Sequence, residues 1–282
     1  MTAPDHQKDI QALRQFFQTG ITRPHDWRRQ QLLSLRAAVL EHQQDIAAAL
    51  YTDLKKSPEE AYGTETGLLL AEINTTLKNL RSWMRPRRAG TNLLNLPSSS
   101  KIYRDPLGVV LIIAPWNYPF QLSLIPLVGA IAGGNCIVLK PSELAPATAA
   151  VIERILTGIF PPGLIHVAQG EGSVILPALM SSFRFDHIFF TGSIPVGRSI
   201  YQQAAKDLVP VTLELGGKSP AVVESDAHIA TAARRIAFAK FSNAGQTCIA
   251  PDYLLLHVGI KDRFMRELQD TIRQFYGEDE EK

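Results

Sequence analysis

No charged residue occurs between Asp105 and Lys140, an interval long enough to cross a membrane if it formed one helix. Three prolines interrupt this interval, at Pro115, Pro119 and Pro126. The pieces predict a buried strand over residues 108–114, an apolar helix over about 120–132 and a second buried strand over 135–139. An uncharged strand, helix and strand in this order indicate the core of an α/β protein rather than a membrane span.

Short β-branched runs continue to alternate with helical segments through the rest of the chain. These runs cover residues 165–168, 186–190, 211–215, 221–224 and 253–258. Such alternation is typical of βαβ units and of a mostly parallel sheet, so the predicted fold class is α/β. Before the uncharged interval, amphipathic helices are expected over about 27–50 and 58–83, where they would cover a neighbouring domain.

The overall charge and the cysteine content exclude several classes of protein. Lysine and arginine number 29 against 27 acidic residues, so the net charge of +2 gives no general attraction to nucleic acid or to an anionic membrane. Two cysteines in 282 residues argue against a secreted fold built on disulfides, and the first residues lack the apolar core of a signal peptide. We therefore expect a cytoplasmic protein with neither a nucleic-acid nor a membrane partner.

The two cysteines differ in their surroundings. The segment 241–253 places Cys248 among small and polar residues, where a turn or helix start could expose the sulfur and favour its thiolate. We therefore predict that Cys248 is a nucleophile, and the alternative is a small buried side chain, because free cysteines are usually buried. Cys136 has the apolar neighbours 137–139, and a structural thiol is expected there.

Candidate cofactor-binding residues follow two of the expected strands. Open parallel sheets bind ligands at the carboxyl ends of their strands. After a strand that ends at Phe190, a segment with Gly192 and Ser193 runs to Gly197 and a helix follows, and free amides at that helix start would suit a pyrophosphate. The spacing is not the usual G-x-G-x-x-G, so a turn that only joins strand to helix is the alternative. Lys140 and Glu143 could hold ribose hydroxyls or could belong to a solvated loop.

Glu214 is a candidate general base. It lies between two leucines and just before two glycines, so its carboxylate could be partly desolvated, which would raise its pKa into the range of a base. A glutamate on the surface of a strand is the alternative. The histidines are scattered without any short spacing typical of metal ligands, so no metal site is predicted.

Five motifs, taken together and in this order, carry a specific resemblance. They are Ala114–Phe120, Lys140–Glu143, Phe190–Ser193, Leu213–Lys218 and Gly245–Cys248. In this order they resemble the NAD(P)-dependent aldehyde dehydrogenases, and the details look most like the class 3, fatty-aldehyde branch. The likeness reaches from the first helices to the last residue. It implies a Rossmann-like cofactor domain followed by the beginning of an α/β catalytic domain.

The resemblance also implies roles for single residues. Cys248 would attack the aldehyde carbon, Asn117 would stabilise the oxyanion together with the Cys248 amide, and Glu214 would activate water to hydrolyse the thioester. The cofactor would be NAD, with NADP possible, bound through a larger set of residues. That set is Lys140, Glu143, Gly192, Ser193, Gly197 and Trp116. The carboxylate of Glu143 favours NAD, because it would repel a 2′-phosphate.

The resemblance places the helices and the cofactor domain in residues 1–210, with part of a bridging segment near 85–105, and the start of the catalytic domain in 211–282. Family members continue for more than a hundred residues beyond this point. We therefore expect a fragment with little activity, and the homodimer expected of the full-length family is doubtful for it. The alternatives are a nucleotide-binding module without catalysis and an interaction protein derived from such an enzyme.

Overall fold

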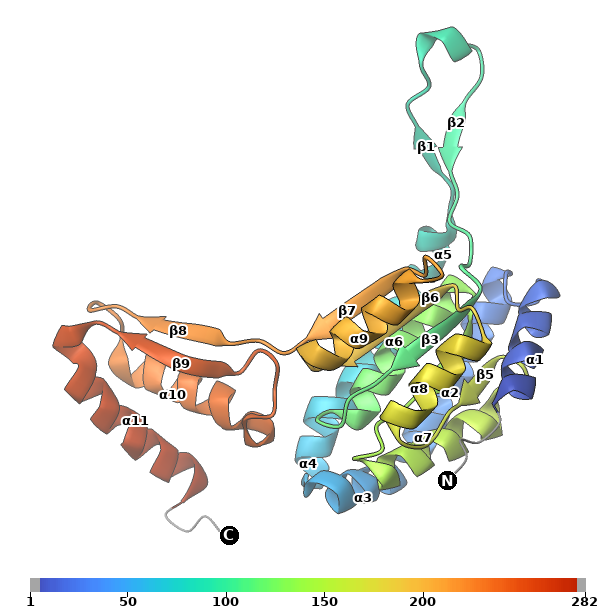
Figure 1. Cartoon of the computed structure of the whole chain (residues 1–282). Helices are drawn as coiled ribbons and strands as arrows, with labels where there is room; N and C mark the ends of the chain where they lie inside the picture. Colours follow the sequence, from blue (N-terminus) through green and yellow to red (C-terminus); the bar gives the residue numbers. More distant parts are fainter. Residues whose placement is uncertain (1–5, 278–282) are drawn as a thin grey trace. The chain divides into compact units, whose positions relative to one another are not determined.

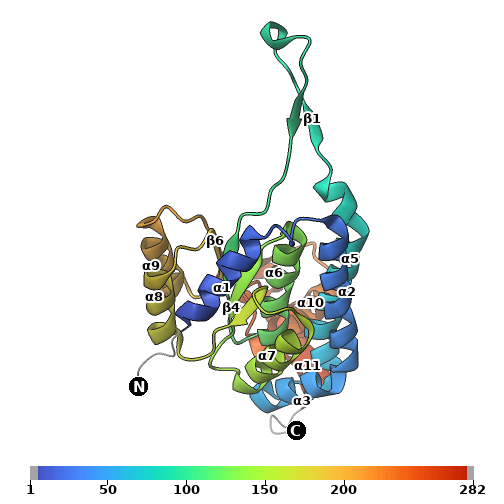
Figure 2. The same ribbon diagram turned by 90° about the vertical axis from the view of Figure 1, so that its right-hand side faces the viewer.

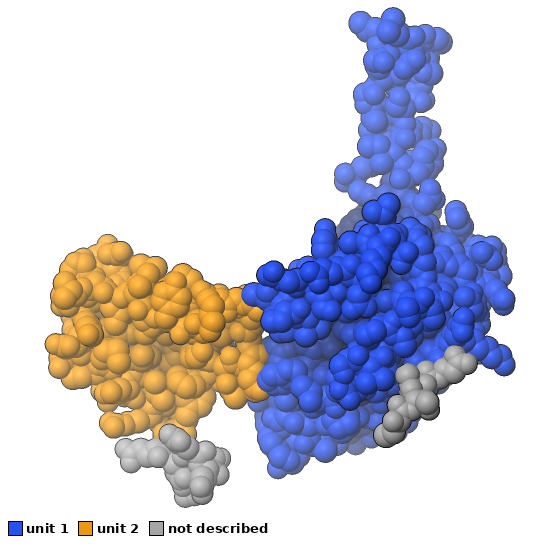
Figure 3. Space-filling model, viewed as in Figure 1, with its two compact units in different colours: residues 1–214 blue, residues 215–282 orange. Residues whose placement is uncertain are grey.

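The computed structural model describes residues 6–277. The chain forms two compact units, residues 1–214 and residues 215–282 (Figure 3). The boundary between the two units lies inside the expected strand over 211–215, because residues 211–214 pair with the sheet of the first unit. None of the described helices is long and apolar enough to cross a membrane.

The first unit is built on a five-stranded sheet with the order β5-β4-β3-β6-β7. Its strands are β3 (Val109–Ile113), β4 (Cys136–Lys140), β5 (Ile165–Val167), β6 (His187–Gly192) and β7 (Val211–Leu215). β3 is parallel to both β4 and β6, and β4 is parallel to β5. Every residue of β3 and β4 is buried, as expected for central strands covered on both faces.

Helices cover both faces of this sheet (Figure 2). On one face lie α6 (Pro119–Gly133) and α7 (Pro146–Ile159), and on the other lie α1 (Gln7–Gln18), α8 (Gly172–Ser182) and α9 (Ile194–Ala205). The uncharged interval therefore forms β3, α6 and β4. Its lack of charge reflects burial in the core, which confirms the interpretation drawn from the sequence.

A second layer of helices packs against α6 and α7. It consists of α2 (His25–Glu41), α3 (Gln43–Leu54) and α5 (Gly67–Met84). α4 (Pro58–Ala61) and a π-helical turn at Tyr62–Thr66 connect α3 to α5, and the turn also contacts α6. The helix that the sequence predicted over about 58–83 is therefore interrupted. The amide of Gly67 donates to the carbonyl of Tyr62, a hydrogen bond that spans one residue more than in an α-helix.

A β-hairpin extends from the first unit (Figure 1). Its strands β1 (Arg87–Ala89) and β2 (Ser100–Ile102) are antiparallel, and a 3₁₀ turn at Leu93–Asn95 lies near its tip. The side chains of Leu93 and Leu94 are 84% and 94% exposed. The segment expected to belong to a bridging element thus presents apolar side chains that the described part of the chain does not cover.

The second unit contains a two-stranded parallel sheet and two long helices. Its elements are β8 (Ser219–Val223), α10 (Ile229–Phe241), a 3₁₀ turn (Ser242–Gly245), β9 (Pro251–Leu256), a second 3₁₀ turn (Val258–Ile260) and α11 (Lys261–Tyr276). Val223, Ile229, Ala233 and Phe264 form its core.

One face of this small sheet is exposed. Val222 is paired with Leu255 and Pro220 with Tyr253, so the side chains of Val222, Tyr253 and Leu255 point to the same face. These side chains are 61%, 47% and 51% exposed. Within residues 215–277, the sheet of the second unit is therefore covered by helix on one side only.

Candidate functional site

The predicted cofactor-binding residues of the first unit lie at one edge of its sheet. β4, β3 and β6 run in the same direction, so their carboxyl ends lie together. Trp116 and Asn117 follow β3, Lys140 ends β4, and Gly192 ends β6. The chain proceeds from β3 toward β5 on one side and returns to β6 on the other. This edge between β3 and β6 is therefore the topological switch point at which open α/β sheets bind ligands.

Lys140 and Glu143 form an ion pair. The Lys140 side chain is 3% exposed and that of Glu143 is 37% exposed. The other carboxylate oxygen of Glu143 accepts a hydrogen bond of 2.9 Å from the amide of Gly172, at the start of α8. Burial alone would raise the pKa of Glu143, but the hydrogen bonds from Lys140 and Gly172 outweigh it and lower the pKa. The structure thus presents an ionised, partly accessible carboxylate, which could accept hydrogen bonds from ribose hydroxyls.

The turn from β6 into α9 is built around close packing. A Cβ atom at Gly192 would lie 2.6 Å from the ring of Phe190, so only glycine fits there without a shift. Ser193 is exposed at the N-cap, and its side chain forms no capping hydrogen bond with the described residues. The amide of the buried Gly197 donates to the Ser193 carbonyl at 2.9 Å. Helix amides before Gly197 are therefore not satisfied by a side-chain cap and could bind phosphate oxygens.

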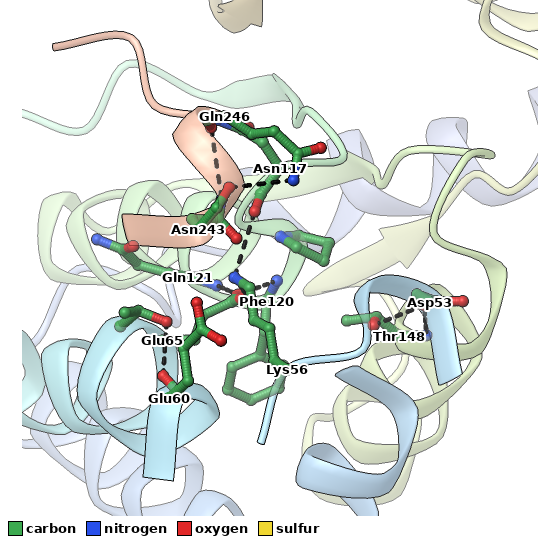
Figure 4. Close-up of polar contacts among 12 residues, drawn as sticks. Asp53, Lys56, Glu60, Glu65, Asn117, Phe120, Gln121, Thr148, Asn243 and Gln246 are labelled. Carbon is green, nitrogen blue, oxygen red and sulfur yellow. Dashed lines mark hydrogen bonds and ion pairs between the residues drawn. The ribbon is translucent and has the colours of Figure 1, made fainter. Parts of the chain in front are cut away.

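Asn117 lies in the turn between β3 and α6, which two buried charged side chains support (Figure 4). Lys56 donates a hydrogen bond of 3.3 Å to the Asn117 carbonyl. Glu65 accepts hydrogen bonds from the amides of Phe120 and Gln121, in the first turn of α6. Trp116, next to Asn117, is 37% exposed. Sequence reasoning missed Lys56 and Glu65, because a lysine between two expected helices and a glutamate in an amphipathic helical pattern both indicate solvated side chains.

Cys248 lies in an exposed turn of the second unit, between the 3₁₀ turn and β9. Three successive residues before it, Asn243, Ala244 and Gly245, have φ angles of 53°, 52° and 77°. Left-handed residues other than glycine are unfavourable and are often found at functional sites. The carbonyl of Cys248 would lie 2.9 Å from a Cβ atom at Gly217, so this glycine permits the close approach of the turn.

The two thiols differ as the sequence predicted. Cys248 is exposed, whereas Cys136 is buried in β4. Burial raises the pKa of the Cys136 thiol to about 12, so this thiol remains protonated at neutral pH. Of the two sulfurs, only that of Cys248 is accessible to a substrate.

Glu214 is exposed rather than partly desolvated, which agrees with the alternative of a glutamate on the surface of a strand. It lies on β7, the edge strand of the five-stranded sheet, and its neighbours Leu213 and Leu215 are only half-buried. The two leucines therefore do not enclose the carboxylate between them. Within residues 6–277 we find no group of three or more histidine, cysteine, aspartate or glutamate side chains that could hold a metal ion.

Comparison with protein families identifies the family of this chain. The model of the aldehyde dehydrogenase family matches residues 1–282. The chain belongs to the aldehyde dehydrogenase family. It is 47% identical over 263 residues to the 4,4'-diaponeurosporen-aldehyde dehydrogenase of Staphylococcus aureus, covering 93% of this chain and 57% of that protein. It is 44% identical over 272 residues to the aldehyde dehydrogenase family 3 member A2 of Rattus norvegicus, covering 96% of this chain and 56% of the rat protein.

Solved structures of aldehyde dehydrogenases share the fold of this chain. The substrate-bound state of Staphylococcus aureus AldH matches with a TM-score of 0.93 and 45% identity, over 96% of this chain and 59% of that one. A betaine aldehyde dehydrogenase of Staphylococcus aureus in complex with NAD+ matches with a TM-score of 0.86 and 28% identity, over 97% of this chain and 55% of that one. The resemblance and the α/β fold predicted from the sequence are thereby confirmed. The chain spans little more than half the length of these relatives.

Proposed function

We propose that this aldehyde dehydrogenase family chain carries the cofactor-binding part and the nucleophile of an enzyme that oxidises an aldehyde to a carboxylic acid. The observation that carries the proposal is the exposed thiol of Cys248 in its strained turn, whereas the thiol of Cys136 is buried. NAD(P)+ would supply the hydride acceptor. The substrate would be a small-molecule aldehyde, and the sequence indicates no nucleic-acid or membrane partner.

The chemistry begins at Cys248. Its thiolate attacks the aldehyde carbon, the carbonyl π electrons move to oxygen, and a thiohemiacetal anion forms. The side-chain amide of Asn117 and the backbone amide of Cys248 would donate hydrogen bonds to that oxygen, which stabilises the charge as it develops. When the carbonyl re-forms, the carbon loses a hydride and Cys248 holds a thioester.

Glu214 completes the cycle. Its carboxylate takes a proton from a water molecule, the hydroxide attacks the thioester carbon, and the C–S bond breaks to release the carboxylic acid and the Cys248 thiolate. In the described chain Glu214 is exposed, so water can reach it freely.

The cofactor would bind at the carboxyl edge of the first unit's sheet. Lys140 and Glu143 would hold the ribose hydroxyls of the adenosine, and Gly192, Ser193 and the start of α9 would face the pyrophosphate. Trp116 and Gly197 would complete this site. The ionised Glu143 favours NAD over NADP, because its charge would repel a 2′-phosphate.

Two measurements on the 282-residue chain test the proposal. Limiting iodoacetamide followed by peptide mapping should modify Cys248 before Cys136, and the reverse preference would contradict the role of Cys248. Calorimetric titration should detect NAD, and Glu143→Gln should bring the affinities for NAD and NADP closer together. If the parent chain and Glu143→Gln prefer NAD over NADP to the same degree, Glu143 does not determine the choice of cofactor.

A nucleotide-binding module without catalysis is the second candidate, and one observation favours it. The chain spans 57% of its Staphylococcus aureus relative, so parts needed for turnover can lie in the remainder. Cofactor binding without NADH formation in this chain, combined with turnover in a chain extended to the relatives' length, would support this candidate for the 282 residues. A family-length enzyme is expected to be a cytoplasmic homodimer.

A further inference from the structure

Lys56 and Glu65 form an ion pair in the interior of the first unit (Figure 4). Their side chains are 1% and 0% exposed, and Nζ of Lys56 lies 2.5 Å from Oε1 of Glu65. Removing two charges from water is costly, and a buried ion pair often contributes no more stability than apolar side chains of the same volume. Neither residue belongs to the proposed chemistry, so stability alone is a weak explanation for the pair.

Both members of the pair hold the same short segment. Oε2 of Glu65 accepts hydrogen bonds of 2.9 Å from the amide of Phe120 and 3.0 Å from that of Gln121, two donors that a helix start leaves without partners of its own. On the other side, Lys56 donates to the carbonyl of Asn117 at 3.3 Å. Glu65 therefore fixes the first turn of α6, and Lys56 fixes Asn117, two residues before the helix begins.

The aromatic ring next to Asn117 is held as well. The ammonium group of Lys56 lies 4.3 Å from the centre of the Tyr118 ring, within the range of a cation–π interaction. Burial raises the pKa of Glu65, whereas Lys56 and the two amides oppose this rise. Loss of Lys56 would therefore favour protonation of Glu65 and would weaken its charge-assisted hydrogen bonds to α6.

We propose that Lys56 and Glu65 are positioning residues that together set the Asn117 turn, and thereby aim the Asn117 side chain at the oxyanion. The inference rests on the proposed function, because that function requires the Asn117 side chain to be held in one position. Its physical part, that the pair determines the geometry of residues 116–121, is independent of that function.

The 282-residue chain offers a matched set of variants. Lys56→Met with Glu65→Gln removes both charges at once, so no unpaired charge stays buried and folding is retained. Asp53→Asn is the control. The Asp53 carboxylate accepts hydrogen bonds from the amides of Ala147 and Thr148 at 3.1 Å and 2.7 Å, so it caps α7 in the same manner (Figure 4). The control perturbs a helix start that does not contain Asn117.

Hydrogen exchange measures the first turn of α6 directly. The double variant should increase exchange at Phe120 and Gln121 by on the order of 10- to 100-fold, the equivalent of losing hydrogen bonds to a charged group. Asp53→Asn should raise exchange at Ala147 and Thr148 instead. Unchanged exchange at Phe120 in the double variant would show that the pair does not hold the turn and would overturn the proposal.

The fluorine NMR resonance of a labelled Trp116 reports on the segment next to Asn117. Trp27, Trp83 and Trp116 are the tryptophans of the chain, so fluorotryptophan labelling gives three resonances that single phenylalanine substitutions assign. In the double variant the Trp116 resonance should shift or broaden while those of Trp27 and Trp83 stay in place. Equal shifts of all three would indicate a general loss of packing and would contradict a local positioning role.

Kinetics in the chain extended to the relatives' length separate this inference from the proposed function. The double variant should lower kcat by on the order of 10- to 100-fold and leave KM for the aldehyde within about twofold. Asn117→Ala provides the reference. If it has no effect on kcat, the proposed role of Asn117 fails, whatever the exchange data show. If it lowers kcat and the double variant does not, the positioning role fails.

Discussion

Gly217→Ala tests how closely the Cys248 turn is packed. A Cβ atom at residue 217 would lie 2.9 Å from the Cys248 carbonyl oxygen, and ordinary contacts begin at 3.4 Å, so one side must move by about 0.5 Å. Gly216 is the matched control, because a Cβ atom there would have nothing within 4 Å. Neither glycine has a positive φ, so a difference between the two substitutions reports packing and not backbone strain.

The expected magnitude follows from this overlap. Inserting a methyl group into a packed site costs about 1–3 kcal/mol, whereas alanine at the open Gly216 should be neutral or should stabilise by about 0.4–1 kcal/mol. In the chain extended to the relatives' length, displacing the Cys248 backbone by half an ångström should slow the first NADH burst by roughly tenfold, since a displacement of about 1 Å can cost about 100-fold.

Urea unfolding of both variants, with hydrogen exchange of residues 246–250, measures the effect in the 282-residue chain. Gly217→Ala should lower the urea midpoint and raise exchange in the turn, while Gly216→Ala should leave both close to those of the parent. Equal midpoints and equal exchange in the two variants would refute the inferred contact between Gly217 and the Cys248 carbonyl.

Three further predictions concern the base, the histidines and the open sheet. In the chain extended to the relatives' length, Glu214→Gln should allow one hydride transfer but slow thioester hydrolysis by about 10²–10⁴-fold, giving an NADH burst and a slow steady state; undiminished steady-state turnover would exclude Glu214 as the base. Burial lowers the pKa of His166 and of His187 below the ordinary value of 6.5. As the pH drops below 6.5, the unfolded chain therefore binds protons that the folded chain does not, and the free energy of unfolding should fall. Urea midpoints at about pH 7.5 and about pH 5.5 measure this, and asparagine at both positions should reduce the difference; a difference that both substitutions leave intact must have another origin. The exposed apolar face around Val222 and Tyr253 predicts that the 282-residue chain associates and has little dehydrogenase activity alone, and sedimentation that showed a monodisperse monomer with ordinary turnover would contradict this.

Central elements could be predicted from the sequence because their pattern depends on burial alone. β3 and β4 are buried on both faces, so their apolar runs left no ambiguity, and the expected strand over 211–215 has the same bounds as β7. The π-helical turn at Tyr62–Thr66 could not be predicted. Its extra residue does not alter the amphipathic pattern enough to be recognised, and the turn brings Glu65 to α6, a contact that no local pattern contains.

The site shows the same division between local and tertiary signals. The exposure of Cys248 could be inferred from the small and polar residues around it. The surroundings of Glu214 could not be inferred from its two leucine neighbours, because an edge strand leaves them half-buried. Lys56 and Glu65 are charged residues that the fold buries against each other, and a sequence pattern cannot distinguish them from charges on a solvated face.

The π-helical turn also sets the rotational phase of the helix that follows it. An α-helix turns by about 100° per residue, so an added or removed residue rotates every side chain on one side of the change by about that angle. Deleting the exposed Gly63 would convert the turn into regular α-helix and would rotate α4 by about this angle relative to Glu65 and α5, which lie on the same side of the deletion. Since Leu69 and Ile73 on α5 are fully buried, the core fixes that helix. The length of this segment is therefore constrained from both ends, and a single-residue deletion is tolerated less well here than a change of side chain.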